Sequence, residues 1–336
     1  MSEVKELAPR VIKAQNGLNK RGLTPKQARE DRKLHDETKA FAVANDLDFG
    51  ISKKQFHIKL DGEFIPTNDF GLVNTVSREV LNSVKDGYRV SQNHHIIRLM
   101  LKGVKPFNKE LEVVKAGSLN GGRKVFIQLK IIGDGFVKGD KIERYVTVID
   151  SNDGTASLSV GIGNLTMSCK NQFFYFYKNG DAKFRHSASM AEKMKEIPSL
   201  IQAALSRSMK MQDLYENFAS TPCSRDLAHK MVDHQLGINL LSSKDKLEEL
   251  STRKKNQMEK LYENIYGEMV GDENNGNVGK GENLWGLFSG VTRWTTHDKS
   301  APRRPNGRME GVMVGNNYKN NLKALDFVLE ESGLSF

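Results

Sequence analysis

The sequence predicts an α+β protein: an antiparallel β-meander of four to six strands, packed with helices on one face and followed by a mainly helical C-terminal half. Three observations predict this class. Residues 144–149 and 156–160 place alternate side chains on opposite sides, which is typical of half-buried strands. Asn152-Asp153-Gly154 lies between them and has the composition of a hairpin turn, because Asp-Gly accepts positive φ. After His186, apolar residues recur at helical spacing.

The N-terminal part predicts a helical extension followed by a short β-hairpin. Residues 1–23 are polar, and Thr24-Pro25 has the composition of a helix start, with a hydroxyl cap followed by proline. This helix is expected to reach about Asp46. Residues 50–70 then predict short strands around the Asp61-Gly62 turn.

Two amphipathic helices and a further hairpin are expected next. Residues 75–85 bring three valines and Leu81 near one helical face, and Ser91 is expected to cap a second helix that Gly103 closes. Residues 111–116 and 123–131, separated by a glycine-rich turn, predict a hairpin that opens the meander, which we expect to span about residues 111–170.

The C-terminal half predicts a succession of helices. The expected helices are Ser187–Phe218 with a bend at Pro198, Ser224–Gln235, Lys244–Val270, Asn283–Trp294 and Tyr318–Glu330. We divide the chain into a helical N-terminal extension (1–49), an α+β sheet core (50–190), a helical region (191–270), a flexible loop (271–282) and C-terminal helices that pack back on the core (283–336).

Composition limits the classes of function. The chain has 336 residues, 38 % of them hydrophobic, and a net charge of +10, which favours polyanionic partners through counterion release. A basic surface that binds nothing is the alternative. The sequence has no long apolar run, no secretory leader and only two cysteines without CxxC spacing. We therefore expect a cytoplasmic protein with no membrane partner.

Basic side chains near aromatic ones are the candidate nucleic-acid contacts, because single-strand binders need cations for phosphates and flat rings for bases. Phe173, Phe174 and Phe176 are expected in the core instead. The candidate residues lie on the predicted hairpins, beside the aromatic run and in the C-terminal loop: Arg123, Lys124, Lys130, Arg144, Lys170, Arg185, His186, Arg293, Arg303, Arg304 and Arg308.

Signals for catalysis are weaker. Asp150, Asn152 and Asp153 have oxygen ligands for a divalent cation, but hairpin-shaping Asx turns explain the same residues better. Cys169 with His186 is the one nucleophile–base pair in the patterned region, and a lone strand cysteine is usually a small buried hydrophobe. The sequence has no Walker A loop, dinucleotide fingerprint, HExxH or EF-hand motif. We expect no metal and no cofactor, and we favour a non-catalytic function.

The sequence resembles a known family over most of residues 75–330. The resemblance rests on these segments: YRVSQN at 88–93, SLNGGRKVFIQL at 118–129, GDKIERYVTVIDSNDGTASLSV at 139–160, MSCKN, FRH at 184–186, ENLWGLFSGVTRWTTH at 282–297 and the arginine-bearing loop before Gly311. Together they resemble the phage/plasmid-like proteins gathered as domain of unknown function 932. The family often has histidine where this chain has Asn152 and valine where it has Ser168, so a role that needs that histidine is weakened here.

This resemblance implies a phage or other mobile element as the setting. A weaker similarity, in architecture and charge, is to viral single-strand annealing proteins of the RecT and Red-beta kind. We therefore expect single-stranded DNA binding or annealing in phage recombination or replication, with RNA left open, by a homo-oligomer in the cytoplasm of the host cell. Two alternatives remain open: an interaction protein that targets a host defence or regulatory factor, and a metal-dependent nuclease that uses Asp150, Asp153, Cys169 or His186.

Overall fold

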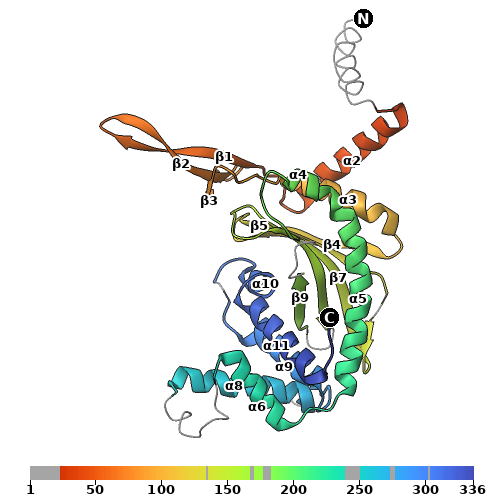
Figure 1. The fold of residues 1–336 in the computed structure, drawn as a ribbon. Helices are drawn as coiled ribbons and strands as arrows, with labels where there is room; N and C mark the ends of the chain where they lie inside the picture. Colours follow the sequence, from red (N-terminus) through yellow and green to blue (C-terminus); the bar gives the residue numbers. More distant parts are fainter. Residues whose placement is uncertain are drawn as a thin grey trace, which may run out of the picture.

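The computed structural model describes residues 23–133, 135–166, 170–176, 183–238, 250–272, 277–301 and 303–336. It confirms the α+β class, with antiparallel sheets of three and seven strands and a mainly helical C-terminal part (Figure 1). Cys169 and nearly all of the polar segment 1–23 lie outside the described residues.

The seven-stranded sheet is the predicted meander, with one strand more than expected. Its order is β10-β8-β7-β5-β4, with β6 paired to β7 and β9 to β8, and every pairing is antiparallel. The strands are β4 (Leu111–Leu119), β5 (Lys124–Ile131), β6 (Gly135–Val137), β7 (Asp140–Ser151), β8 (Leu158–Thr166), β9 (Gln172–Phe176) and β10 (Lys183–Phe184).

The main core lies on one face of this sheet. Val146 and Val148 of β7 point toward it, as the alternation predicts, and are at most 1 % exposed. The helices α3 (Asn93–Val104) and α5 (Ile197–Ser220) cover this face. Burying these aliphatic side chains supplies about 1.5–3 kcal/mol each and fixes the register of the meander.

The opposite face carries a second, smaller core. Phe126, Ile149, Phe174 and Phe176 pack there against α10 (Gly307–Met313), and α11 (Asn316–Ser332) adds Tyr318. Helices therefore lie on both sides of the sheet and not on one face as predicted, with α5 on one side and α10 and α11 on the other (Figure 1). The three phenylalanines of the aromatic run are each 3 % exposed, which confirms their core assignment.

The helices between α5 and α10 pack around one another beside the sheet. Ser224 and Asn283 cap the helices that follow them, as predicted. The helix expected from Ser187 is interrupted, and α5 begins at Ile197 with Pro198 in its first turn, where a missing N–H costs nothing. Before α5 the chain forms the short helices α4 (Met190–Lys193) and η3 (Met194–Glu196). After α5 come α6 (Arg225–Leu236), α8 (Thr252–Val270), the short strands β11 (Gly271–Asp272) and β12 (Asn277–Val278), α9 (Leu284–Arg293) and the π-helical turn η5 (Trp294–Asp298).

Before the main sheet, α2 (Pro25–Ala44) starts with the predicted cap, Thr24. The predicted boundaries of α3 are wrong at both ends. Gln92 occupies the N-cap position, because the Ser91 hydroxyl donates to Asp150 instead. Gly103 lies inside the helix, where a Cβ would meet the Pro198 backbone at 3.1 Å, so its small size serves helix packing. The short helix η1 (Lys105–Phe107) follows.

The three-stranded sheet is formed by β1 (Ile51–Leu60), β2 (Glu63–Asn74) and β3 (Val80–Lys85). Its β1–β2 hairpin, which we call the arm, extends away from the rest of the molecule (Figure 1). The predicted turn at Asp61-Gly62 forms its tip, where both residues have positive φ. The prediction of a helix over residues 75–85 is wrong, because the C-terminal part of this segment is the edge strand β3. A register shift between Leu72 and Val73 of β2 interrupts the pairing with β3, and the burial of β3 does not alternate with period two.

Candidate functional site

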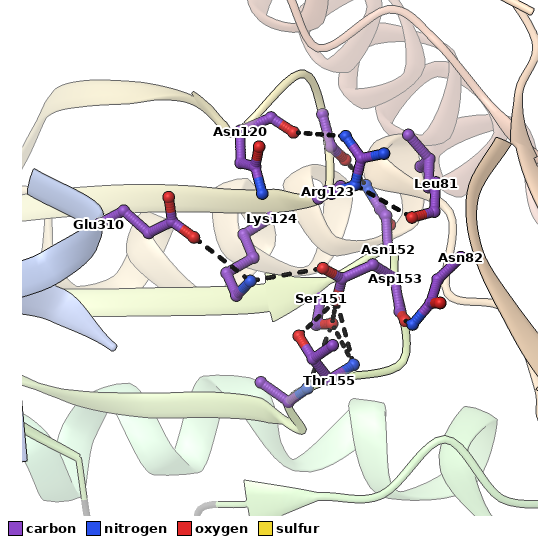
Figure 2. Close-up of polar contacts among 12 residues, drawn as sticks. Leu81, Asn82, Asn120, Arg123, Lys124, Ser151, Asn152, Asp153, Thr155 and Glu310 are labelled. Atoms are coloured by element: carbon purple, nitrogen blue, oxygen red, sulfur yellow. Dashed lines mark hydrogen bonds and ion pairs between the residues drawn. The ribbon is translucent and has the colours of Figure 1, made fainter. Parts of the chain in front are cut away.

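The loop between β7 and β8 gathers several of the predicted site residues around one turn. Gly154 has φ +72°, and the Ser151 hydroxyl and the Thr155 backbone N–H and hydroxyl all donate to the Asp153 carboxylate, at 2.5, 3.0 and 2.6 Å (Figure 2). The sequence-predicted turn and its Asx chemistry are therefore present. We call this loop and the side chains that contact it the β7–β8 cluster.

His186 lies against Asp150 at the end of β7. Its Nε2 is 3.0 Å from Asp150 Oδ1, out of line for a hydrogen bond, and its Nδ1 is 3.0 Å from the carbonyl oxygen of Arg89. A carbonyl oxygen only accepts, so Nδ1 carries a proton, and the carboxylate favours a second proton on Nε2. Burial by itself lowers the pKa of His186, but Asp150 and the Arg89 carbonyl outweigh it and raise that pKa. The contact with Asp150 therefore favours the protonated, cationic form of the ring.

Tyr88 covers this imidazole. The two rings are stacked 4.7 Å apart at 12°, and the Tyr88 hydroxyl donates to the carbonyl oxygen of Ser151 at 3.1 Å. Burial raises the pKa of Tyr88, so the phenol stays neutral. The stacked pair lines an open depression of about 230 Å³ together with Gly154, Thr155, Ala156, Ser157 and the exposed Arg185. One depression thus offers a flat ring, an arginine and two hydroxyls.

Lys124 connects the turn to α10. Its side chain is 12 % exposed, and its ammonium lies 3.4 Å from Asp153 Oδ2 and 3.5 Å from Glu310 Oε1 (Figure 2). Glu310 also accepts from the Arg304 guanidinium at 2.7 and 3.1 Å. Burial by itself raises the pKa of Asp153, but the hydrogen bonds from Ser151 and Thr155 and the charge of Lys124 outweigh it and lower that pKa.

Arg123 fastens β3 to the main sheet. Its guanidinium donates to the carbonyl oxygens of Leu81 and Asn120 at 3.0 and 3.4 Å (Figure 2). It also pairs with Glu79 at 3.1 Å. Asn82 of β3 donates to the Asp153 carbonyl at 2.8 Å. These contacts hold the base of the arm next to the β7–β8 cluster.

The other predicted site residues lie elsewhere or are committed to different partners. Lys130 is six residues along β5 from Lys124, about 20 Å away, and pairs with Glu143. Arg293 pairs at 3.0 Å with Glu268, whose side chain is fully buried, and Glu268 also binds Lys280, from the predicted loop 271–282, at 2.6 Å.

Four further candidates complete the set. Arg144 is half-buried on β7, and burial lowers its pKa. Arg308 donates to the carbonyl oxygens of Thr296 and Lys299, and Arg303 is exposed in the loop before α10. Lys170 is exposed before β9, at the end of β8 away from the β7–β8 cluster. The cluster therefore collects Arg123, Lys124, Arg185, His186 and, through Glu310, Arg304.

The geometry fits binding better than catalysis. The raised pKa of His186 favours the protonated ring, which has no lone pair with which to accept a proton, and the Ser91 hydroxyl donates to Asp150 and not to His186. A divalent cation at Asp153 would meet the Lys124 ammonium 3.4 Å from the same carboxylate, so these residues do not fit a metal site. Burial raises the pKa of the Cys223 thiol to about 11, which leaves it protonated.

Sequence reasoning missed Tyr88, Ser91 and Glu310 as members of the cluster. The first two belong to YRVSQN at 88–93, a segment for which the sequence predicts only a helix cap, at Ser91. Glu310 follows Arg303, Arg304 and Arg308 in the sequence, and a single carboxylate close to several arginines indicates an ion pair within the protein.

None of the helices in the described part of the chain is long and apolar enough to cross a membrane. A family model described as "Domain of unknown function (DUF932)" matches residues 80–320, a range that contains the whole β7–β8 cluster and begins after the arm. Comparison with curated proteins gives no match, and neither does comparison with solved structures.

Proposed function

The chain belongs to the family described as Domain of unknown function (DUF932), and from the geometry of its β7–β8 cluster we propose that it binds single-stranded nucleic acid without catalysing a reaction. The concrete form of the proposal is single-stranded DNA binding or annealing in the recombination or replication of a phage or other mobile element, in the cytoplasm of its host. This setting rests on the resemblance described above and on the net charge of +10.

One observation carries the proposal: the depression that Arg185 shares with the stacked rings of Tyr88 and His186. A single strand needs a cation for its phosphates and a flat surface for its unstacked bases, and base–aromatic stacking contributes about 1–3 kcal/mol per base. The Ser157 side chain at the same depression supplies a hydroxyl that can donate to a phosphate oxygen.

Ion pairing narrows the set of phosphate contacts. Lys124, Lys130, Arg293 and Arg304 each lie within 4 Å of a carboxylate that is at most 16 % exposed, so their charges are largely neutralised inside the protein. Arg185 is exposed and lines the depression, which makes it the leading candidate of the original set.

The test is fluorescence anisotropy with labelled single-stranded DNA, single-stranded RNA and duplex DNA across a salt series. We expect salt-sensitive binding that prefers single strands, and Arg185→Ala should weaken it and reduce the slope of log K against log salt by about 0.7. Arg29→Ala on α2 removes the same charge from an exposed arginine outside the cluster and is the matched control. Affinity that does not change with salt concentration, or equal effects of Arg185→Ala and Arg29→Ala, would contradict the proposal.

A second candidate function, protein binding, is favoured by the tip of the arm. Ile58, Leu60 and Phe64 are 55, 55 and 70 % exposed there, an unusual concentration of apolar side chains on a projecting element. The first candidate partner is a second copy of this chain, in the expected homo-oligomer. Light scattering of wild type and Phe64→Ser tests this self-association. A host factor is the other candidate partner, and it is tested by capture from nuclease-treated lysate with wild type and Phe64→Ser as baits. If both proteins behave alike in both assays, the arm does not serve this function.

A further inference from the structure

A second cavity, separate from the β7–β8 cluster, opens on the sheet face that α10 covers only in part. It measures about 240 Å³ and is lined by Lys115, Gln128, Tyr145, Gln172, Phe174 and Met309, among others. Roughly 300–1,000 Å³ is typical of pockets for drug-sized ligands. This cavity therefore suits one ring system and not a whole nucleotide.

Gln128 lines this cavity with a side-chain amide that makes no hydrogen bond to the described residues. The residue is 7 % exposed, and its direct cross-strand neighbour on β7, Thr147, is fully buried and does not line the cavity. The amide can therefore exchange hydrogen bonds with water for hydrogen bonds to a ligand that enters the cavity.

The walls of the cavity are flat and aromatic. Phe174 of β9 lies over Gly163 of β8, where a Cβ would meet the phenyl ring at 2.8 Å, so glycine allows the ring to lie close against the sheet. Tyr145 borders the same space, and its hydroxyl donates to Glu143, which leaves the ring to line the cavity. Exposed Lys115 lies at the rim and reaches Met309 of α10, with 3.6 Å between Nζ and Sδ.

Flat walls with a side-chain amide between them match a purine base. A glutamine amide presents a donor and an acceptor side by side, the pattern that pairs with N6 and N7 of adenine. Proteins that read single strands stack unpaired bases on aromatic rings and bond their edges in this way. We propose that this cavity holds one unpaired adenine base, read by Gln128 and lined by Tyr145 and Phe174, while Lys115 meets the phosphate or ribose outside.

The base has two possible sources, a single strand or a free nucleoside, and the first rests on the proposed function. The experiment compares labelled oligo(dA) with oligo(dT) by anisotropy and follows adenosine by saturation-transfer NMR, using wild type and Gln128→Met. Methionine keeps the length of the side chain but removes the unpaired amide, so the variant should unfold at the same or a higher temperature. A good amide–adenine pair corresponds to a discrimination of about 5- to 150-fold.

We expect wild type to prefer oligo(dA) within that range and Gln128→Met to lose the preference while its affinity for oligo(dT) is unchanged. Adenosine saturation that disappears in Gln128→Met, without a preference between the oligonucleotides, supports the cavity with free nucleoside as its ligand. Equal binding of both oligonucleotides with no adenosine signal refutes adenine binding in the cavity and does not affect the proposed function. If neither oligonucleotide binds, the proposed function fails, and the adenosine signal alone decides the inference.

Discussion

Asp150→Asn should destabilise the protein strongly in acid and weakly in mild base. In the wild type the buried His186 imidazole lies 3.0 Å from Asp150, and their side chains are 4 % and 0 % exposed. Because the pKa of His186 is raised, its contribution to stability is complete below the ordinary value of 6.5 and declines as the pH rises through the folded-state pKa. The asparagine removes the charge that raises this pKa.

The size of the effect follows from what remains around the imidazole. At about pH 5 the variant must either bury an unpaired imidazolium or deprotonate it, and breaking a buried pair costs about 3–5 kcal/mol. At about pH 8 a neutral ring still donates its Nδ1 proton to the Arg89 carbonyl, and Nε2 faces an uncharged amide, so no buried charge is left unpaired. The amide oxygen still accepts from Ser91. The loss should then fall to about 1 kcal/mol.

Urea denaturation followed by the fluorescence of the buried Trp285 and Trp294 measures this difference at the two pH values. Asp86→Asn is the matched control, because it makes the same substitution on a side chain that is 87 % exposed and pairs with Lys53. It should cost less than about 0.5 kcal/mol at either pH. Equal losses for Asp150→Asn at both pH values, or none in acid, would refute the assignment of His186 as a cation.

Substitutions at three further positions test other parts of the structure. Gly154→Ala places a methyl group at φ +72° and 3.0 Å from Val84 Cγ1, and should cost about 1–3 kcal/mol in urea denaturation; no loss would mean that the turn has another conformation. Glu268→Gln leaves the buried Lys280 underpaired and should cost about 3–5 kcal/mol; a loss typical of a surface site would contradict the buried network. Tyr88→Ala should weaken single-strand binding by about 1–3 kcal/mol, while Tyr88→Phe keeps the ring and the affinity; parallel losses would argue against stacking.

The meander could be predicted from sequence because its signals are local. Alternation along β5, β7 and β8 and the Asp153-Gly154 turn involve neighbours in the chain, and the sheet follows them. The strand β3 was mistaken for a helix because its burial depends on β2, with which it pairs out of simple register. Alternation is lost where an edge strand meets a register shift, and the remaining apolar spacing fits a helix.

The candidate site was predicted only as a set of charges. Sequence shows that Lys124 and Arg304 are basic, but not that Glu310 lies between them, because the pairing is made when α10 folds back onto the sheet. The contact of His186 with Asp150 likewise joins two segments that come together only in the folded protein. A count of cations therefore overestimates the positive charge that a polyanion meets.

The arm has a consequence for how this protein can change over generations. Its tip residues belong to neither hydrophobic core, and the matched family range begins only at residue 80. Substitutions at the tip therefore leave the stability of the body almost untouched, whereas a change at Asp150 or Glu268 disturbs a buried charge. Selection on the tip can act through whatever the arm meets, independently of selection on the fold, so the arm can diverge quickly while the sheet beneath it stays constant.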